Sequence, residues 1–442
     1  MTAIAPGRRQ ITALVAGLVV TCISFCARAD EHDRVAETEW ARGFVIDSVL
    51  VSGNTRVRDE AILREMQLRA GARFDPEMLE RDRRFIEDLS AFATADAAVD
   101  SAGAGHCIIR VCVTERSSLV TSLAYPVLEY DFDRQRLRYG VRWNDRNFRK
   151  RLESLSSSAI RDNLGRDNVS AGWSTRWVGW TQLGLSVGGS YFHRHDAPIE
   201  RAIVEQTRVS AGVSIPLVDS RARVVQITGG LGLTNNRLGE SGQSSTFETL
   251  VSPGVGVRYD SRDSGLRPRK GEALFSGLTL HTVVNDGRGP YFLYTADARL
   301  YRAVSPRSVL AMWTRLDYQF GEFPDYIRFG LGGSGTLRGY NRNAFRGSHR
   351  WFQTAELRIS PWNRWLTRFP IVGVTDFRLA FAVFVDTGIA WRRAASFSSD
   401  NAHSGFGAGL RLYSPIQDVL RFDVGMTAHG TAHAYFSSGV RF

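Results

Sequence analysis

The sequence predicts a mainly β protein: a 16-stranded antiparallel transmembrane β-barrel preceded by one small α+β domain. The first observation is composition, because the 442 residues include 42 glycines and 11% aromatic residues, and 43% are hydrophobic. The second is that apolar residues alternate with polar ones, as in strands with one face in lipid and one in a hydrated lumen. A disordered chain would lack this many aromatic residues. A helical-bundle membrane protein would need several long apolar runs, and this chain has only one, at its N-terminus.

Residues 1–29 are predicted to be a cleaved secretory signal peptide. Arg8 and Arg9 precede an apolar stretch over 11–26, and Ala27-Arg28-Ala29 provides a small-residue cleavage site. A membrane anchor is the alternative, but the stretch is short and acidic residues follow it at once. Cleavage would remove three arginines and lower the net charge from +11 to +8. Anionic lipid headgroups or a basic lumen explain such a charge, so we expect no nucleic-acid partner.

Residues 30–43 are expected to be a linker, and residues 44–116 the α+β domain. A Gly53-Asn54 turn follows the domain's first strand. The expected elements, in order, are a strand over 44–51, a helix over 60–68 capped by Asp59, a helix from Pro76 capped by Asp75, and strands over 92–99 and 107–114. The exposed edges of a small sheet can accept an extended peptide as an added strand. The domain is therefore either a docking site for unfolded chains and partners or a spacer that orients the barrel.

Residues 119–442 are expected to form the barrel. Val209, Ala211 and Val213 alternate with small or polar residues, for example, and the same pattern recurs along the chain. The predicted strands begin near 119, 135, 152, 167, 182, 203, 221, 247, 271, 291, 307, 350, 376, 403, 417 and 431. One or two soluble β-sandwiches are the alternative, but the export signal, the strand number and the aromatic content favour a barrel. The last strand, with Phe436, Val440 and the terminal Phe442, resembles the recognition signal of outer-membrane barrels.

Three further motifs go beyond a generic barrel. Leu337-Arg338-Gly339-Tyr340 lies in the longest connection, over 321–349, and Phe384-Val385-Asp386-Thr387-Gly388 lies in a late strand. Tyr259-Asp260-Ser261-Arg262-Asp263 opens the later half of the barrel. Together they resemble the BamA/TamA outer-membrane assembly superfamily, also called the bacterial surface antigen family, over residues 44–442. The resemblance identifies the α+β domain as a single POTRA domain. It places the protein in the bacterial outer membrane, with this domain in the periplasm.

The resemblance also implies that Arg338, Gly339 and Tyr340 fold back into the lumen to contact the strand of Phe384, Asp386 and Gly388, and an acidic residue one strand earlier. The strand patterns agree, because alternation turns Asp386, Gly388 and Glu356 toward the lumen. Arg338 would then bind Asp386 and Glu356 through charge-assisted hydrogen bonds. We call these seven residues the predicted loop–barrel lock. The alternative is an extracellular arginine unrelated to Asp386.

The function implied by the resemblance is insertion or translocation of unfolded outer-membrane or secreted polypeptides. Outer-membrane lipids and a periplasmic partner at the POTRA domain would be the other partners. A passive pore and a structural anchor of the same fold are the alternatives. Family members that perform multi-subunit assembly have several POTRA domains. This sequence has room for one POTRA domain, so the identity of the client polypeptide stays open. The histidines are scattered and no hydrolase or phosphate-loop motif occurs, so we expect no catalytic residue, metal site or cofactor.

Overall fold

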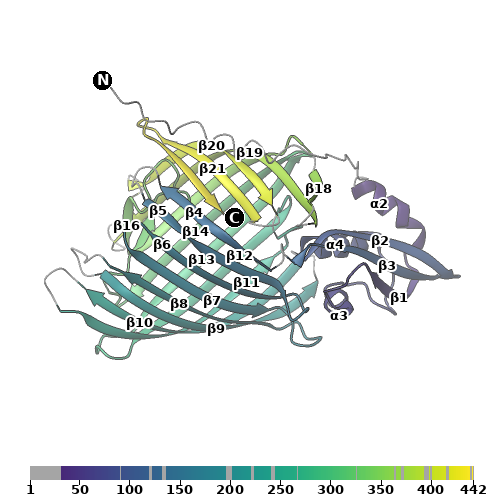
Figure 1. Ribbon diagram of the computed structural model, residues 1–442, viewed down its shortest axis with the longest axis horizontal. Helices are drawn as coiled ribbons and strands as arrows, with labels where there is room; N and C mark the ends of the chain where they lie inside the picture. The colour runs from purple at the N-terminus through teal and green to yellow at the C-terminus, as the bar shows by residue number, and fades with distance from the viewer. Residues whose placement is uncertain are drawn as a thin grey trace, which may run out of the picture.

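The computed structural model describes residues 31–89, 91–118, 122–131, 136–195, 202–220, 223–239, 244–265, 267–324, 326–362, 365–369, 373–392, 398, 401–414, 418–438 and 441. The predicted signal peptide, Val440 and Phe442 lie outside these residues. Figure 1 shows a large barrel with a small N-terminal domain, in purple, at one end.

The N-terminal domain has the predicted order of strand, helix, helix, strand, strand. Its elements are α2 (Glu31–Thr38), the 3-10 helix η1 (Glu39–Ala41), β1 (Val45–Ser52), α3 (Asp59–Leu63), α4 (Pro76–Asp88), β2 (Phe92–Gly103) and β3 (His106–Glu115). The sheet order is β1-β3-β2, with β1 parallel and β2 antiparallel to β3. Its core includes Ile46, Ile62, Phe74, Ile86 and Phe92, all nearly inaccessible to solvent. The domain therefore has a hydrophobic core of its own.

The segment over 30–43, predicted to be a linker, contains α2 and η1. One prediction for this domain was wrong: the helix predicted over 60–68 ends at Leu63, and its N-cap is Arg58 rather than Asp59. The backbone N–H groups of Gln67 and Leu68 donate to the carboxylate of Asp82 on α4, which replaces the carbonyl acceptors of a longer helix. Asp75 does cap α4, accepting from the backbone N–H of Met78 at 3.0 Å.

The Gly53-Asn54 turn has a steric requirement for glycine. Gly53 has φ +83°, and a Cβ at this position would fall 2.0 Å from the carbonyl oxygen of Val113. Asn54 donates from Nδ2 to the carbonyl of Val57 at 2.9 Å. Glu115, at the end of β3, closes the turn by accepting from the backbone N–H of Val57 at 2.7 Å and from other donors of the turn. Burial opposes ionisation of Glu115, but these hydrogen bonds prevail and lower the pKa of its carboxyl.

The second part of the chain is a closed antiparallel barrel of 16 strands, as predicted. The strands are β4 (Ser122–Asp131), β5 (Arg136–Phe148), β6 (Glu153–Asp162), β7 (Arg166–Thr175), β8 (Gly184–Arg194), β9 (Ala202–Ser220), β10 (Arg223–Gly239), β11 (Thr246–Asp260), β12 (Gly271–Val283), β13 (Tyr291–Ser305), β14 (Ser308–Gly321), β17 (His349–Ile359), β19 (Gly373–Trp391), β20 (His403–Ser414), β21 (Asp418–Thr427) and β22 (Ala432–Ser438). Short strands β15 (Phe329–Leu331) and β16 (Phe345–Gly347) form a hairpin between β14 and β17, and β18 (Trp365–Phe369) pairs with β19. Consecutive strands are neighbours, and β22 meets β4 to close the barrel.

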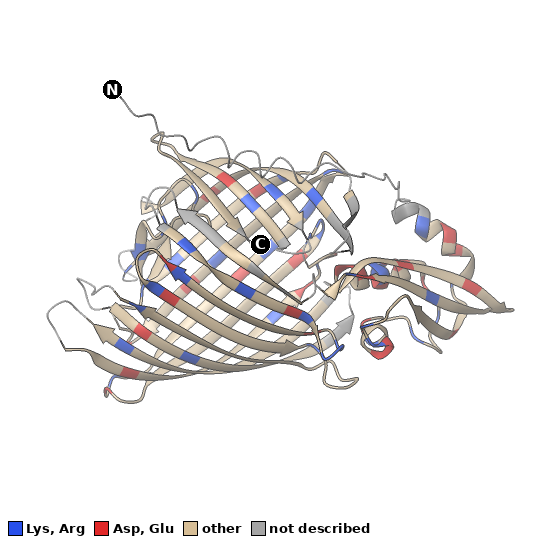
Figure 2. Cartoon of the chain, viewed as in Figure 1, with Lys and Arg blue, Asp and Glu red and all other residues tan. Residues whose placement is uncertain are grey.

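The strands carry the alternation that the sequence predicts. On β19, Phe381, Val383 and Val385 are 44%, 52% and 53% exposed, whereas the intervening Ala382 and Phe384 are 2% and 3% exposed. The apolar face of the strand therefore points outward, to lipid. Figure 2 shows charged residues along the barrel strands and on the N-terminal domain. Among the described residues, no helix has both the length and the apolar character needed to cross a membrane.

The N-terminal domain contacts turns at its end of the barrel. Glu65, which is 3% exposed and follows α3, accepts from Trp177 Nε1 at 2.9 Å and from Arg176 Nη2 at 3.2 Å. Trp177 and Arg176 belong to the connection between β7 and β8. Arg58 donates through its backbone N–H to the carbonyl of Lys150, between β5 and β6, at 3.2 Å. These contacts, of which the Glu65–Trp177 hydrogen bond is buried, hold the domain against this end of the barrel.

Candidate functional site

The connection between β14 and β17 folds into the barrel and packs on its inner wall. Arg338 and Leu337, at its tip, are both fully buried. The wall accommodates the tip because two strand residues are glycines: a Cβ on Gly405 would fall 1.9 Å from the carbonyl oxygen of Arg338, and one on Gly425 would fall 2.6 Å from the amide nitrogen of Gly339. Larger residues at these two positions would exclude the loop.

Arg338 binds Asp386 in a bidentate arrangement. Its Nε and Nη2 each donate to one carboxylate oxygen of Asp386 at 2.8 Å, and its backbone N–H donates to the same group at 3.0 Å. Thr354 Oγ1 donates to Asp386 at 2.8 Å. The guanidinium carbon lies 3.2 Å from the centre of the Phe384 ring, which adds a cation–π contact. Arg338 and Asp386 are both inaccessible to solvent, so both charges depend on these partners.

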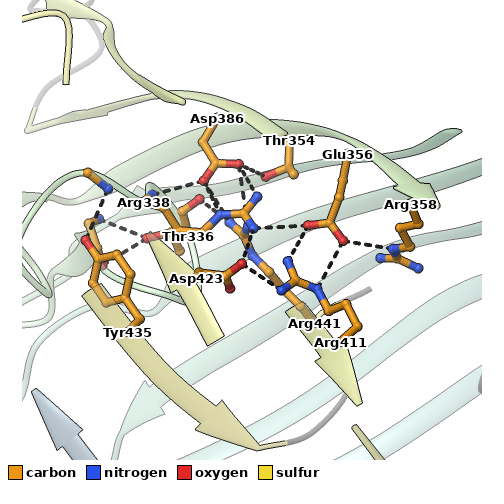
Figure 3. A network of polar contacts seen from close by, with 12 residues as sticks. Thr336, Arg338, Thr354, Glu356, Arg358, Asp386, Arg411, Asp423, Tyr435 and Arg441 are labelled. Atoms are coloured by element: carbon orange, nitrogen blue, oxygen red, sulfur yellow. Dashed lines mark hydrogen bonds and ion pairs between the residues drawn. The ribbon is translucent and has the colours of Figure 1, made fainter. Parts of the chain in front are cut away.

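Glu356 on β17 is the second carboxylate of the site. It accepts from Arg338 Nη1 at 3.0 Å, from Arg411 Nη2 at 2.8 Å and from Arg358 Nε at 2.8 Å. A third carboxylate, Asp423 on β21, lies 2.7 Å from Arg411 and 3.4 Å from Arg338. Figure 3 shows these groups converging from the loop and several strands. The site thus ties the loop to strands β17, β19, β20 and β21.

The last strand and the end of the chain also contact the loop. Tyr435 on β22 donates through its hydroxyl to the carbonyl of Tyr340 at 2.8 Å and accepts from the Gly339 N–H at 3.1 Å. Arg441 lies 3.5 Å from Asp386 and donates to the carbonyl of Thr336 (Figure 3). The loop is therefore in direct contact with β22, the strand that closes the barrel.

The structure brings most of the predicted lock residues together. Arg338 contacts Glu356, Phe384 and Asp386 as described, and Tyr340 donates to the carbonyl of Ser404 at 3.2 Å. Gly388 makes room for apolar side chains, because a Cβ there would meet Phe352 and Leu331 at 2.9 and 3.0 Å.

The other predicted site residues lie elsewhere. Phe436 is 42% exposed on β22 and belongs to the outward face. Gly53 and Asn54 lie in the turn of the N-terminal domain that Glu115 closes. Among the described residues, no group of three or more metal-ligating side chains is present.

Sequence reasoning missed Arg411, Asp423, Tyr435 and Arg441. The strand patterns contain part of the signal, because Asp423 alternates with Phe422 and Val424 and so belongs to the inner face. Alternation gives the face of a residue but not its height or its partner on another strand. We propose that the whole cluster locks the loop to the barrel wall.

Comparisons with known proteins find matches for both parts of the chain. Residues 147–442 match the Omp85 superfamily domain, and residues 44–101 match a POTRA domain of the surface antigen variable number repeat type. The outer membrane protein assembly factor BamA of Neisseria meningitidis is 22% identical over 89% of this chain. The match covers 53% of that protein, so the chain spans about half the length of this relative.

Solved structures show the same fold at low sequence identity. BamA from Haemophilus ducreyi lacking POTRA domains 1–3 has a TM-score of 0.54 at 16% identity, covering 90% of this chain and 84% of its own. CdiB from Acinetobacter baumannii has a TM-score of 0.59 at 14% identity, covering 90% and 74%. CdiB from Escherichia coli has a TM-score of 0.62 at 14% identity, covering 89% and 76%. At these identities the likeness establishes the fold alone.

Proposed function

Because the chain belongs to the Omp85 superfamily, we propose that it inserts or translocates polypeptides at the outer membrane. It is an outer-membrane β-barrel with a periplasmic POTRA domain, related in sequence to BamA and similar in fold to the CdiB barrels. The proposed clients are unfolded outer-membrane or secreted polypeptides, and the proposed domain limits are 44–116 for the POTRA domain and 119–442 for the barrel. The proposed mechanism involves no covalent step.

The observation that carries the proposal is the seam between the first and last barrel strands. Within residues 122–131 and 432–438, β4 and β22 pair at one position, Tyr435 with Asp131. On its other side, β4 pairs with β5 along its whole length, from Ser122–Asp145 to Asp131–Arg136. Backbone groups that lack a strand partner can pair with a strand from another chain. The seam thus offers a template on which an incoming strand can form its first hydrogen bonds.

The POTRA sheet offers a second place for an extended segment. Because β3 is central, β1 and β2 each have an outer edge, and the edge of β1 is already bonded to residues 71–73 at Val45 and Ile46. An extended client or a periplasmic partner can add to such an edge through main-chain hydrogen bonds. We propose that the domain receives the client there. Its buried contacts with the barrel would then hold the client near the seam, whereas a pure spacer would not bind extended peptides.

A passive pore is the second candidate, and one observation favours it. A cavity of about 590 Å³ lies against the inner faces of β10 to β13, and Thr228, Arg258 and Thr295 are among its lining residues. The loop that carries Arg338 packs against β13, β14 and β17 through Leu337, and against β19 to β21 through Arg338 and Gly339. None of its described residues is among those that line the cavity, so the loop does not fill this part of the lumen.

Reconstitution distinguishes the two functions. The purified barrel is placed in liposomes, an unfolded outer-membrane barrel is added from outside, and its folding is timed against protein-free liposomes. Faster folding supports insertion. Folding at the protein-free rate, together with steady ion conductance across the same membranes, supports the pore and makes the POTRA domain a spacer.

A further inference from the structure

A groove runs along the lipid-facing side of β13. Two small residues, Ala296 and Ala298, form its floor, and a cavity of about 500 Å³ lies over them. A second cavity of about 330 Å³ shares Leu274, Ala298 and Thr314 with the first and extends to Leu300. The lining of both cavities is mostly apolar. The two cavities therefore form one continuous groove on the outside of the barrel.

Larger side chains border this groove on the neighbouring strands. Leu274 on β12 and Thr314 on β14 lie directly opposite Ala298. Leu274 is 40% exposed, so this row of side chains points out of the barrel. Trp351 on β17 extends the border and donates through Nε1 to Thr314 Oγ1 at 3.0 Å, which satisfies the only donor of its indole ring. Gln353, opposite Thr314, adds an amide to a lining that otherwise suits a hydrocarbon chain.

The groove extends toward the periplasmic end of the barrel. The turns between β5 and β6 and between β7 and β8 contact the POTRA domain, and the turns that follow β11 and β13 lie at the same end of the antiparallel barrel. The smaller cavity reaches Glu272, one residue from the start of β12. Arg269 Nη2 donates to the carbonyl of Ser305 at 2.9 Å, which joins these two turns. The turns therefore lie at the level of the lipid headgroups of the periplasmic leaflet.

Two basic side chains project from these turns. Lys270 and Arg307 are exposed, and within the described part of the chain their side chains form no hydrogen bond or ion pair. The carbonyl of Arg307 accepts from the backbone N–H of Ser360 at 2.8 Å, so the connection after β17 is adjacent. Residues 305–308 and 360–364 include no Asp or Glu. These turns thus provide cations and no carboxylate.

The carboxylates of the turn after β11 and of β12 have other partners. Asp263 accepts from the backbone N–H groups of Arg269 and Lys270 at 2.8 and 3.1 Å. Glu272 forms an ion pair with Arg302 at 2.9 Å. Two cations at the periplasmic end of the groove are therefore available to an anion from outside the chain.

We propose that this groove binds one anionic glycerophospholipid of the periplasmic leaflet. An acyl chain lies over Ala296 and Ala298, and the phosphate lies beside Lys270 and Arg307. The chain gains van der Waals contacts along the groove, and the phosphate accepts charge-assisted hydrogen bonds. An apolar protein segment in the same groove would leave both cations unneutralised. Such a site follows from the location of the barrel in the outer membrane and does not depend on whether the protein inserts polypeptides.

The test measures lipid binding to the purified full chain in non-ionic detergent. Phosphatidylglycerol is titrated, and bound molecules are counted by native mass spectrometry. We expect the wild type to retain one phosphatidylglycerol at concentrations at which phosphatidylcholine with the same acyl chains is not retained. Glycerol 3-phosphate, which has the phosphate without acyl chains, should not compete, because the site takes a lipid rather than a free phosphate.

The headgroup contact is tested by charge removal. The double variant Lys270→Gln and Arg307→Gln should bind phosphatidylglycerol about 30-fold more weakly, from the usual contribution of a basic residue at an anionic lipid surface. The double variant Arg149→Gln and Lys150→Gln is the matched control. It removes the same charge from two exposed residues of another periplasmic turn, so it should bind as the wild type does.

The acyl-chain contact is tested by filling the groove. Ala298→Trp should lose phosphatidylglycerol binding, whereas Ala408→Trp should not. Ala408 is the control because it lies between the outward-facing Phe406 and Leu410 of β20, away from the groove. Both substitutions are on the lipid-facing surface, so neither disturbs the packing inside the barrel.

Three results would overturn the proposal. The first is equal binding of phosphatidylglycerol and phosphatidylcholine to the wild type, and the second is equal phosphatidylglycerol binding by each variant and its control. The third is a dimer of the wild type that Ala298→Trp abolishes while phosphatidylglycerol binding is unchanged, which would make the groove an interface between copies of the chain.

Discussion

Replacing Arg338 with alanine removes the side chain that joins the tip of the folded-in loop to Asp386 and Glu356. Both members of the Arg338–Asp386 pair are inaccessible to solvent, and two hydrogen bonds of 2.8 Å link their side chains. Removing one partner of a buried ion pair costs about 3–5 kcal/mol, because the other charge stays buried and uncompensated. Asp386 keeps Thr354 and Arg441 as partners, so we expect the lower end, about 3 kcal/mol.

The assay measures the free energy of unfolding of the detergent-folded barrel, with heat-dependent mobility as a second readout. Arg346→Ala is the control, because Arg346 lies in the same connection with an exposed side chain, and exposed substitutions usually change stability by less than about 0.5 kcal/mol. A double-mutant cycle with Asp386→Asn should give a coupling energy above about 1 kcal/mol. Stability, mobility and client folding that all match those of Arg346→Ala, or a coupling energy near zero, would refute the lock.

Three further predictions concern the POTRA domain and its attachment. Gly53→Ala should destabilise the domain far more than Gly43→Ala. Both glycines have positive φ, but of the two only Gly53 lies where an added Cβ would collide with backbone atoms. Hydrogen exchange of the domain in the full chain measures the difference in stability. Glu115→Gln should destabilise the domain at neutral pH. Because folding lowers the pKa of Glu115, the stability contributed by its carboxylate is present above the unfolded pKa of about 4.3 and is lost as the pH falls through the folded pKa. A loss of stability in the mutant that is the same at pH ~7 and pH ~3 would contradict this role of Glu115. Trp177→Phe removes a buried hydrogen bond and should cost about 1 kcal/mol and increase hydrogen exchange where the domain meets the barrel, whereas Trp180→Phe in the same turn, where the side chain is 58% exposed, should not.

The strands could be predicted from the sequence because their environment has two sides. Each spanning strand faces lipid on one side and the lumen on the other, so its period-2 pattern is present in the sequence itself. The predicted strand starts at 203, 291 and 403, for example, compare with observed starts at Ala202, Tyr291 and His403. The order of neighbours then follows from antiparallel hairpins between consecutive strands.

The helix over 60–68 could not be predicted at its full extent because its end depends on a distant residue. Ile62 and Met66 have helical spacing, and both are buried as expected. The chain nevertheless leaves the helix after Leu63, because Asp82 on another helix binds the next free backbone N–H groups. A local pattern does not contain such a tertiary acceptor.

The candidate site could also be predicted only as far as local sequence patterns and the family resemblance reach. Arg338, Asp386 and Glu356 could be proposed from the resemblance and from the inward faces of two strands. Arg411 and Arg441 could not, because their contacts depend on the register between strands that are far apart in the sequence.

The central claim is that polypeptides are inserted at the seam, and a crosslink between β4 and β22 tests it most directly. Tyr435 and Asp131 are antiparallel partners across the seam, and such partners are close enough for a disulfide. The pair Tyr435→Cys and Asp131→Cys is made in a chain in which the free Cys107 and Cys112 are replaced by alanine. The reduced form of the same protein is the control.

Folding of an added barrel into liposomes is timed with the seam closed and again after reduction. The account predicts that acceleration is lost in the crosslinked protein and returns on reduction. Full acceleration in a sample whose crosslink has been verified would contradict insertion at this seam.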